Sequence, residues 1–269
     1  MDDGHAPAPG TVAVEDAGHL AEEAERRALA AIDDALASRG AARVILAGGS
    51  TPRALYSRLS RSLRGRDLSR VDWFFGDERW VPVEDPQSNE GMARETLLAP
   101  LGAPEPTIHS WRAGQGDPVA CAARYAAEVR SADLLLLGMG ADGHTASLFP
   151  GATARFPDGR DVPVGPNLGG TAAAVPGEAP RGRPAKHGSG DLRAPRDWRL
   201  TLCPDILNTS RVVLFLVSGA DKAPALIRAL SGDPLTPAAW IRGGQTWFIA
   251  TRDALGPERK DFGWQVAHA

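Results

Sequence analysis

Cysteine is scarce in this sequence of 269 residues, which contains only Cys121 and Cys203. The two are far apart, and neither a CxxC pair nor a histidine-rich spacing lies beside them. This pattern argues against a disulfide framework and against a structural zinc site. Cysteine usage of this kind fits a reducing compartment, so we expect a cytoplasmic protein.

Long apolar runs and an excess of one charge are also missing. No window approaches the ~18 uninterrupted apolar residues of a membrane-spanning helix. The first ten residues, MDDGHAPAPG, lack the apolar segment of a secretory signal. The formal net charge of -3 provides no general basic surface for nucleic acid or for an anionic membrane, and we expect neither as a partner. An anionic ligand must therefore be held by locally placed Arg, Lys and backbone N–H groups.

What is present is an alternation of short apolar runs and helical patterns, in a chain that is 43% hydrophobic and 23% charged. Strand-to-helix transitions recur through the first 150 residues, which predicts a parallel sheet. We therefore predict an α/β fold, doubly wound and Rossmann-like, whose mostly parallel sheet has helices on both faces. Strands are expected at 44–47, at 71–75, from 132 up to the glycine-rich turn, near 200–202 and 212–217, and in the segment QTWFIATRDAL. Helices are expected at 15–38, after GGSTP, at 88–101, at 117–132 and from about Asp221.

The expected organisation is a single α/β domain over residues 15–255. Residues 1–14 are acidic and rich in Pro and Gly, and are expected to be a flexible N-terminal tail, with a C-terminal tail at 256–269. Residues 152–197 are dense in Gly, Pro and Arg and are expected to be a loop insertion with one short strand at 171–175. Within this insertion, residues 186–193 are hypothesised to fold over the substrate as a lid.

Gly138, Gly140 and Gly143 match the dinucleotide fingerprint G-x-G-x-x-G directly after an apolar run. That fingerprint counts only when a helix and a second strand follow. Here Pro150 and Gly151 cut the helix short, and the next forty residues contain no long strand. The glycines therefore do not indicate a nicotinamide or flavin cofactor. They indicate either a tight turn or a close approach of the backbone to another ligand.

Three polar, glycine-bearing segments follow predicted strands. GGSTP at 48–52 opens a helix, the usual setting for phosphate, GDERWVP occupies 76–82, and GMGADGH occupies 138–144. A helix cap, a rim ion pair or a packed histidine would explain each one alone. Because the carboxyl ends of parallel strands meet at one edge of the sheet, the three together predict a ligand site there.

Four segments closely resemble the 6-phosphogluconolactonases of the pentose phosphate pathway: LAGGSTPRALYSRL, VDWFFGDERWVPVEDPQSNEGMARETLL, LLLLGMGADGHTASLFPG and VVLFLVSGADKAPALIRAL. The resemblance covers roughly residues 15–151 and 197–252. It implies a doubly wound fold shared with glucosamine-6-phosphate deaminases. It also implies hydrolysis of 6-phospho-D-glucono-1,5-lactone to 6-phospho-D-gluconate with no metal or organic cofactor.

The resemblance also implies roles for individual residues. His144 matches the catalytic base, and Asp77 and Arg79 match polar positions that line the sugar site. The phosphate would lie on the turn of Gly48, Gly49, Ser50 and Thr51, with Arg199 and Lys222 as cationic positions that hold phosphate or sugar oxygens. The long segment 152–197 departs from the family pattern and makes the assignment of Arg199 depend on the short match RLTL.

These residue types suit lactone chemistry. A lactone is an activated ester, so hydrolysis needs an activated water and a group that stabilises developing negative charge. Imidazole titrates near ~6.5, so a neutral His144 can accept a proton from water. Asp142 could orient that ring, with Gly143 beside it, and Arg79 or turn N–H groups could stabilise an oxyanion. No Ser or Cys lies in a recognisable nucleophile motif.

Two alternatives stay open. A glucosamine-6-phosphate deaminase or isomerase would share the GGSTP turn and the Asp-Gly-His element, but carries Asn-Glu-Pro after that histidine and lacks GDERWVP. A sugar-phosphate sensor without catalysis would keep the phosphate turn and tend to lose the base, and would usually carry a further domain. The partner expected here is a small phosphosugar lactone, bound by a monomer or a weak homo-oligomer.

Overall fold

The larger of two sheets contains seven parallel strands, and its central strands are the most apolar. The computed structural model describes residues 8–156, 158–176, 198–256 and 262–266. The sheet order is β12-β1-β11-β10-β5-β2-β3. Four consecutive leucines of β5 are all buried, as expected for a strand covered on both faces. The strands are β1 (Gly10–Val14), β2 (Ala42–Leu46), β3 (Val71–Phe75), β5 (Leu134–Gly138), β10 (Val212–Val217), β11 (Gln245–Thr251) and β12 (Gln265–Val266).

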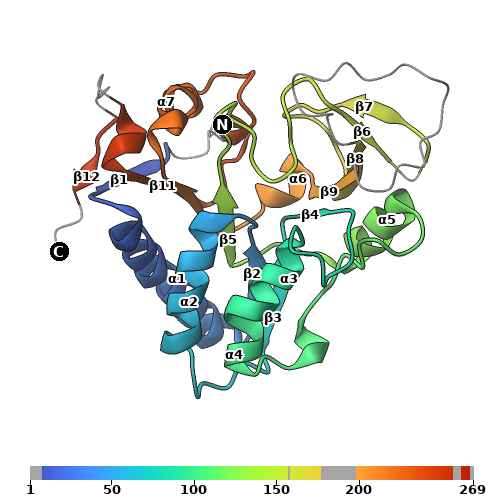
Figure 1. Cartoon of the computed structure of the whole chain (residues 1–269), viewed down its shortest axis with the longest axis horizontal. Helices are drawn as coiled ribbons and strands as arrows, with labels where there is room; N and C mark the ends of the chain where they lie inside the picture. The colour runs from blue at the N-terminus through green and yellow to red at the C-terminus, as the bar shows by residue number, and fades with distance from the viewer. Residues whose placement is uncertain (1–7, 157, 177–197, 257–261, 267–269) are drawn as a thin grey trace, which may run out of the picture.

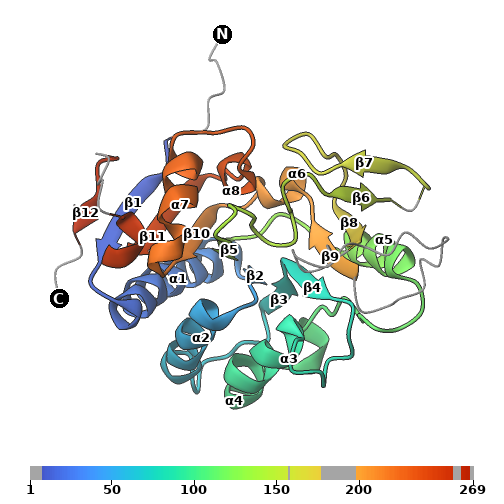
Figure 2. The same cartoon turned by 45° about the horizontal axis from the view of Figure 1, so that its top comes forward.

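Helices cover both faces of this sheet (Figures 1 and 2). Helices α1 (Ala17–Arg39) and α2 (Ser50–Ser62) lead the chain in one direction across the sheet and pack against each other. Helix α7 (Ala223–Leu230) leads it back from β10 to β11. Because such crossovers are right-handed, the reversal of direction puts α7 on the opposite face. The predicted doubly wound α/β fold is therefore confirmed.

The remaining helical segments are short. Those at 89–101 and 118–128 lie within the expected helices, whereas those at 105–107, 204–207, 237–240 and 252–255 were not expected. They are α3 (Asn89–Ala93), a π-helical turn (Arg94–Leu98), α4 (Ala99–Leu101), α5 (Pro118–Glu128), α6 (Pro204–Leu207), α8 (Pro237–Trp240) and 3₁₀ turns at Glu105–Thr107, Ala220–Lys222 and Arg252–Leu255. None of the helices in the described part of the chain is both long and apolar enough to cross a lipid bilayer.

A second, antiparallel sheet of five strands stands beside the first, in the order β4-β9-β8-β6-β7. Three of its strands lie in the segment expected to be mostly loop, and only β8 corresponds to the strand expected at 171–175. Side chains of Ala154, Phe156, Val164 and Leu168 are buried, so this Gly- and Pro-rich stretch contributes to the same hydrophobic core as the larger sheet. The strands are β4 (Asp77–Arg79), β6 (Thr153–Arg155), β7 (Asp161–Pro163), β8 (Ala172–Pro176) and β9 (Trp198–Leu202). Residues 177–197, including 186–193, lie outside the described residues.

Both ends of the chain contribute strands, which differs from the expected tails. Strand β1 lies between β11 and β12, and Val12 and Val14 are buried in the core. The two-residue strand β12 pairs with β1 at the sheet edge. Parallel pairing with β11 recruits residues 10–14, whose short length gave no clear periodicity. Residues 1–7, 257–261 and 267–269 of the expected tails lie outside the described residues.

Candidate active site

A cavity of about 460 Å³ lies at the carboxyl ends of the parallel strands. All three polar segments that follow predicted strands contribute to its lining, and β9 and the turn after β10 complete it. Its lining includes Gly48, Gly49, Ser50, Thr51, Asp77, Arg79, His144, Arg199 and Lys222. The convergence predicted from the strand ends is therefore present in the structure.

The first segment, residues 48–51, is called the anion turn below. Helix α2 begins at Ser50, and its N-cap is Gly49 with φ of 105°, a conformation that glycine adopts without strain. No side chain caps this end of the helix. The first N–H groups of a helix have no intrahelical acceptor, and the helix dipole favours an anion there. The turn therefore has the electrostatic character of a phosphate site.

Two buried contacts fix the anion turn. The Tyr56 hydroxyl donates to the Ala47 carbonyl at 2.7 Å and accepts from the Ala47 N–H at 2.8 Å. Burial raises the pKa of Tyr56, so this hydroxyl keeps its proton. Asn89 packs so closely on Gly48 that a Cβ at that position would lie 1.8 Å from its Oδ1. Glycine at 48 is thus required by a neighbouring side chain.

The second segment places Asp77 and Arg79 on β4. Asp77 accepts from Asn89 Nδ2 at 3.1 Å and from Ser147 Oγ at 2.6 Å, so its carboxylate is fixed by two elements. Arg79 donates to the Gln87 carbonyl at 2.6 Å and lies directly opposite Arg199 in the β4–β9 register. Like charges directly opposite each other are unfavourable in a sheet. An anion in the cavity would offset that repulsion.

The third segment explains the glycine pattern that resembled a dinucleotide fingerprint. A Cβ on Gly140 would lie 2.1 Å from His144 Nδ1, and Gly143 has φ of 92°. Between Met139 and Gly151 the chain forms turns and no helix. The N–H of Gly140 donates to the His144 carbonyl at 2.8 Å, closing the turn. Gly140 therefore leaves room for the His144 ring, Gly143 provides the left-handed turn before it, and a side chain at Gly138 would meet open space.

His144 is paired with Asp142 behind it. Its Nδ1 lies 2.6 Å from Asp142 Oδ1, which also accepts the His144 N–H at 3.1 Å. Burial alone would raise the pKa of Asp142, but the backbone N–H of His144 and its ring outweigh burial and hold that pKa below 3.8. An ionised Asp142 favours the proton on Nδ1. No hydrogen bond to Nε2 occurs among the described residues, so this nitrogen can act as an acceptor.

The ring of Phe149 packs against His144 with 4.7 Å between the ring centroids. This aromatic contact covers part of the imidazole and restricts its rotation. The His144 side chain nevertheless keeps 33% of its surface exposed. The ring is thus held in place and still reachable from the cavity.

Lys222 reaches the cavity from the 3₁₀ turn after β10. Its Nζ lies 2.9 Å from Asp221 Oδ2, and the lysine side chain is the more buried of the pair. Asp142 and Gly143 are not among the residues that line the cavity, and Asp142 holds the His144 ring through Nδ1. The described residues contain no group of three or more His, Cys, Asp and Glu side chains that could hold a metal ion.

Five polar or aromatic lining residues escaped the sequence analysis: Asn89, Thr145, Ser147, Phe149 and Ser218. Ser147 and Phe149 lie within five residues after His144, so their closeness in sequence to the predicted base could have indicated that they line the cavity. Asn89 is ten residues beyond Arg79, after a loop. Only the hydrogen bonds of the folded chain bring it back to Asp77.

A family model described as glucosamine-6-phosphate isomerases/6-phosphogluconolactonase matches residues 15–167 and 176–249. The chain belongs to this family. The 6-phosphogluconolactonase of Synechocystis sp. is 35% identical over 234 residues, which cover 81% of this chain and 85% of that protein. The 6-phosphogluconolactonase of Mycobacterium tuberculosis is 33% identical over 256 residues, covering 89% of this chain and 94% of that protein.

Solved structures of this family agree with the fold. The crystal structure of 6-phosphogluconolactonase from Thermotoga maritima has a TM-score of 0.70 and 26% identity, and the match covers 90% of this chain and all of that one. A monomeric glucosamine-6-phosphate deaminase has a TM-score of 0.73 with 21% identity, over 91% of this chain and 98% of the deaminase chain. The family fold thus serves two activities, and the residues of the site must distinguish them.

Proposed function

We propose that this chain hydrolyses 6-phospho-D-glucono-1,5-lactone to 6-phospho-D-gluconate, the lactonase step of the oxidative pentose phosphate pathway. One observation carries the proposal: an imidazole with a carboxylate behind it and a helix N-terminus without a side-chain cap line the same cavity. A base and an anion site facing one small cavity are what a phosphosugar lactone requires. Relatives that carry the name 6-phosphogluconolactonase support the same assignment.

In the proposed reaction, His144 acts as a general base through Nε2. It removes a proton from water as the water oxygen attacks the lactone carbonyl carbon. The tetrahedral intermediate then collapses with cleavage of the bond between that carbon and the ring oxygen. The imidazolium returns its proton to the departing ring oxygen, which becomes the hydroxyl of the product. No covalent bond to the protein is needed.

Charge stabilisation is assigned to the surrounding cations and N–H groups. The anion turn would hold the phosphate, with Arg199 and Lys222 as its cationic partners. Arg79 would stabilise the tetrahedral oxyanion, an effect worth about 3 kcal/mol per donor in known sites. Asp77 would hold a sugar hydroxyl. Anchoring the phosphate far from the reacting carbon fixes the ring against His144.

The main alternative is a glucosamine-6-phosphate deaminase, since a deaminase shares the fold. Two features oppose it: the chain carries GDERWVP, and TASLFP follows His144 in place of Asn-Glu-Pro. A sensor without catalysis is opposed by the base, which is present and paired with Asp142.

Turnover of freshly prepared lactone tests the proposal. Product formation must be measured above the spontaneous opening of the lactone, with ammonia release from glucosamine 6-phosphate measured on the same preparation. We expect rapid lactone hydrolysis and no ammonia. Ammonia release without lactone hydrolysis would assign the chain to the deaminases, and neither activity together with tight 6-phosphogluconate binding would favour a sensor.

The setting of the enzyme is also part of the proposal. A cytoplasmic location is supported by two cysteines that are buried and unpaired. A monomer or weak homo-oligomer is supported by the described surface, where Leu235 and Val266 are the large apolar side chains left exposed.

A further inference from the structure

Glu78, between Asp77 and Arg79, is almost completely buried. Successive side chains of a strand point to opposite faces, so Asp77 and Arg79 face the cavity while Glu78 faces away. Only 1% of Glu78 is exposed, and no ion pair involves it within the described ranges. A buried carboxylate without a cation is costly unless its oxygens are fully hydrogen-bonded.

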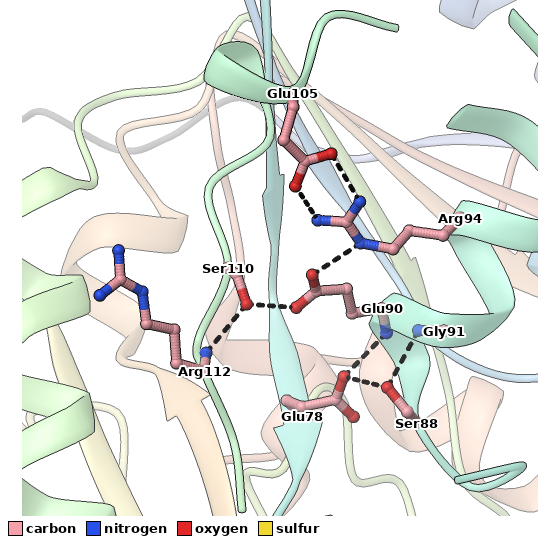
Figure 3. Close-up of polar contacts among 8 residues, drawn as sticks. All are labelled: Glu78, Ser88, Glu90, Gly91, Arg94, Glu105, Ser110 and Arg112. Atoms are coloured by element: carbon pink, nitrogen blue, oxygen red, sulfur yellow. Dashed lines mark hydrogen bonds and ion pairs between the residues drawn. The ribbon is translucent and has the colours of Figure 1, made fainter. Parts of the chain in front are cut away.

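Four donors satisfy this carboxylate. Oε1 accepts from the N–H of Arg79 at 2.7 Å and of Asn89 at 2.8 Å. Oε2 accepts from the N–H of Glu90 at 2.7 Å and from Ser88 Oγ at 2.9 Å. Figure 3 shows the two hydrogen bonds to Oε2. The Oγ of Ser88 also accepts from the N–H of Gly91 at the start of α3. The carboxylate thus joins β4 to the first turn of α3.

Asn89 connects the Glu78 carboxylate to the cavity wall. Its backbone N–H is held by Glu78, while its side chain donates to the Asp77 carbonyl at 3.0 Å and to the Asp77 carboxylate. The other end of the same amide, Oδ1, lies against Gly48 and has no hydrogen-bond partner in the described part of the chain. Asn89 therefore touches both the anion turn and the strand that carries Asp77.

Strand β4 has a strand partner on one side only. It is three residues long and lies at the edge of the second sheet, paired only with β9. On its open side, the N–H of Arg79 donates to the carboxylate of Glu78 instead of to a neighbouring strand. This carboxyl group is ionised above its raised pKa of about 7, and charge-assisted hydrogen bonds are then shorter and stronger than neutral ones.

We propose that Glu78 is a positioning residue, which through Asn89 sets the distance between the anion turn and the side chains of Asp77 and Arg79. The inference rests on the proposed function, because the distance matters only if the phosphate and the lactone ring span these two places. Glu78 itself touches neither. Its effect is on the geometry of the groups that do.

A matched control lies in the same turn. Glu90 is also buried, at 5% exposure, but its carboxylate turns away from β4 and accepts from Ser110 Oγ at 2.6 Å and from Arg94 Nε at 2.9 Å (Figure 3). Arg94 in turn pairs with Glu105. Replacing Glu90 by Gln therefore disturbs an equally buried carboxylate without altering any side chain that contacts Asp77 or Gly48.

The test compares Glu78→Gln with Glu90→Gln at about pH 8, where the Glu78 carboxylate is ionised. In Glu78→Gln an NH₂ group replaces an oxygen that accepted two donors, so donors face donors and β4 separates from α3. We expect kcat/KM for the lactone to fall by about a hundredfold, since misplacement by an ångström can cost that much. We expect Glu90→Gln to stay within about threefold of the wild type at a comparable loss of Tm. Amide hydrogen exchange at Asn89 should accelerate in Glu78→Gln and not in Glu90→Gln.

Each other result has a defined meaning. Equal losses in both variants, or wild-type kcat/KM in Glu78→Gln, would overturn the proposal. If Glu78→Gln does not fold, Asn89→Ala replaces it, because it removes the link to Asp77 and keeps the N–H bonded to Glu78; wild-type activity in that variant would equally overturn the proposal. If the wild type hydrolyses no lactone, the proposed function fails alone, and calorimetry with inorganic phosphate then decides. Weaker phosphate binding in Glu78→Gln than in Glu90→Gln would support the positioning role, and equal binding would overturn it.

Discussion

Nδ1 of His144 lies 2.6 Å from Oδ1 of Asp142, two residues earlier in the same turn. The same oxygen accepts the backbone N–H of His144, so one carboxylate sets both the ring and the main chain that carries it. This arrangement keeps a proton on Nδ1 and leaves Nε2 as the acceptor. In the proposed reaction, Asp142 therefore orients the base and stabilises the imidazolium that forms.

Replacement of His144 by Gln is expected to remove the general base and keep the cavity. Base catalysis by a positioned side chain typically contributes 10²–10⁴-fold, so kcat should fall by about that range. KM should change little, because the anion turn and the cations are untouched. Steady-state kinetics corrected for spontaneous opening check this, with 6-phosphogluconate affinity as the control. Wild-type kcat in this variant would remove His144 from the mechanism.

Replacement of Asp142 distinguishes orientation from charge. In Asp142→Asn the amide oxygen can still accept from Nδ1–H, whereas Asp142→Ala has no acceptor. We expect kcat to fall in both, by roughly 10²-fold in Asp142→Ala and by less in Asp142→Asn, at similar KM. Equal kcat in the wild type and Asp142→Ala would show that the carboxylate has no part in the reaction.

Substitution of two glycines at the cavity is expected to change different kinetic constants. In Gly140→Ala the new methyl group would meet His144 Nδ1, so the base is displaced and kcat falls. In Gly48→Ala it would meet Asn89, so the anion turn shifts and KM rises. We expect changes of about tenfold or more in the named constant for each variant. Each variant serves as the control for the other, and the same defect in both would contradict the separation of base and phosphate site.

Much of this fold could be predicted from the sequence because its central strands are continuous apolar runs. The strand predicted at 71–75 has its observed bounds, the one at 44–47 agrees within two residues, and the one predicted to begin at 132 begins at 134. The strands near the edge of this sheet could not be predicted in the same way. Strand β1 is defined by its parallel pairing with β11, more than 200 residues later, and its five residues contain no periodicity strong enough to show it.

The residues of the site also fall into a part that the sequence predicts and a part that it does not. The anion turn, GDERWVP and the His144 turn could be found because each follows its strand directly in sequence. Asn89 and the Arg79–Arg199 register could not, because both depend on the pairing of β4 with distant segments. The glycine pattern at 138–143 fits its true role only when the close approach of the His144 ring to Gly140 is seen.

The buried carboxylate of Glu78 predicts a pH dependence of stability. Burial raises its pKa from 4.5 to about 7, although four hydrogen-bond donors oppose the shift. Between these pH values the unfolded chain releases a proton that the folded chain keeps, so the free energy of unfolding falls as pH rises. Once both states are ionised, above pH 7, the loss amounts to about 3 kcal/mol. Urea unfolding of the wild type and Glu78→Gln from pH 4.5 to 8 tests this. The stability advantage of the wild type should shrink across that interval, and a constant difference would show that Glu78 ionises in the folded protein as it does in the unfolded chain.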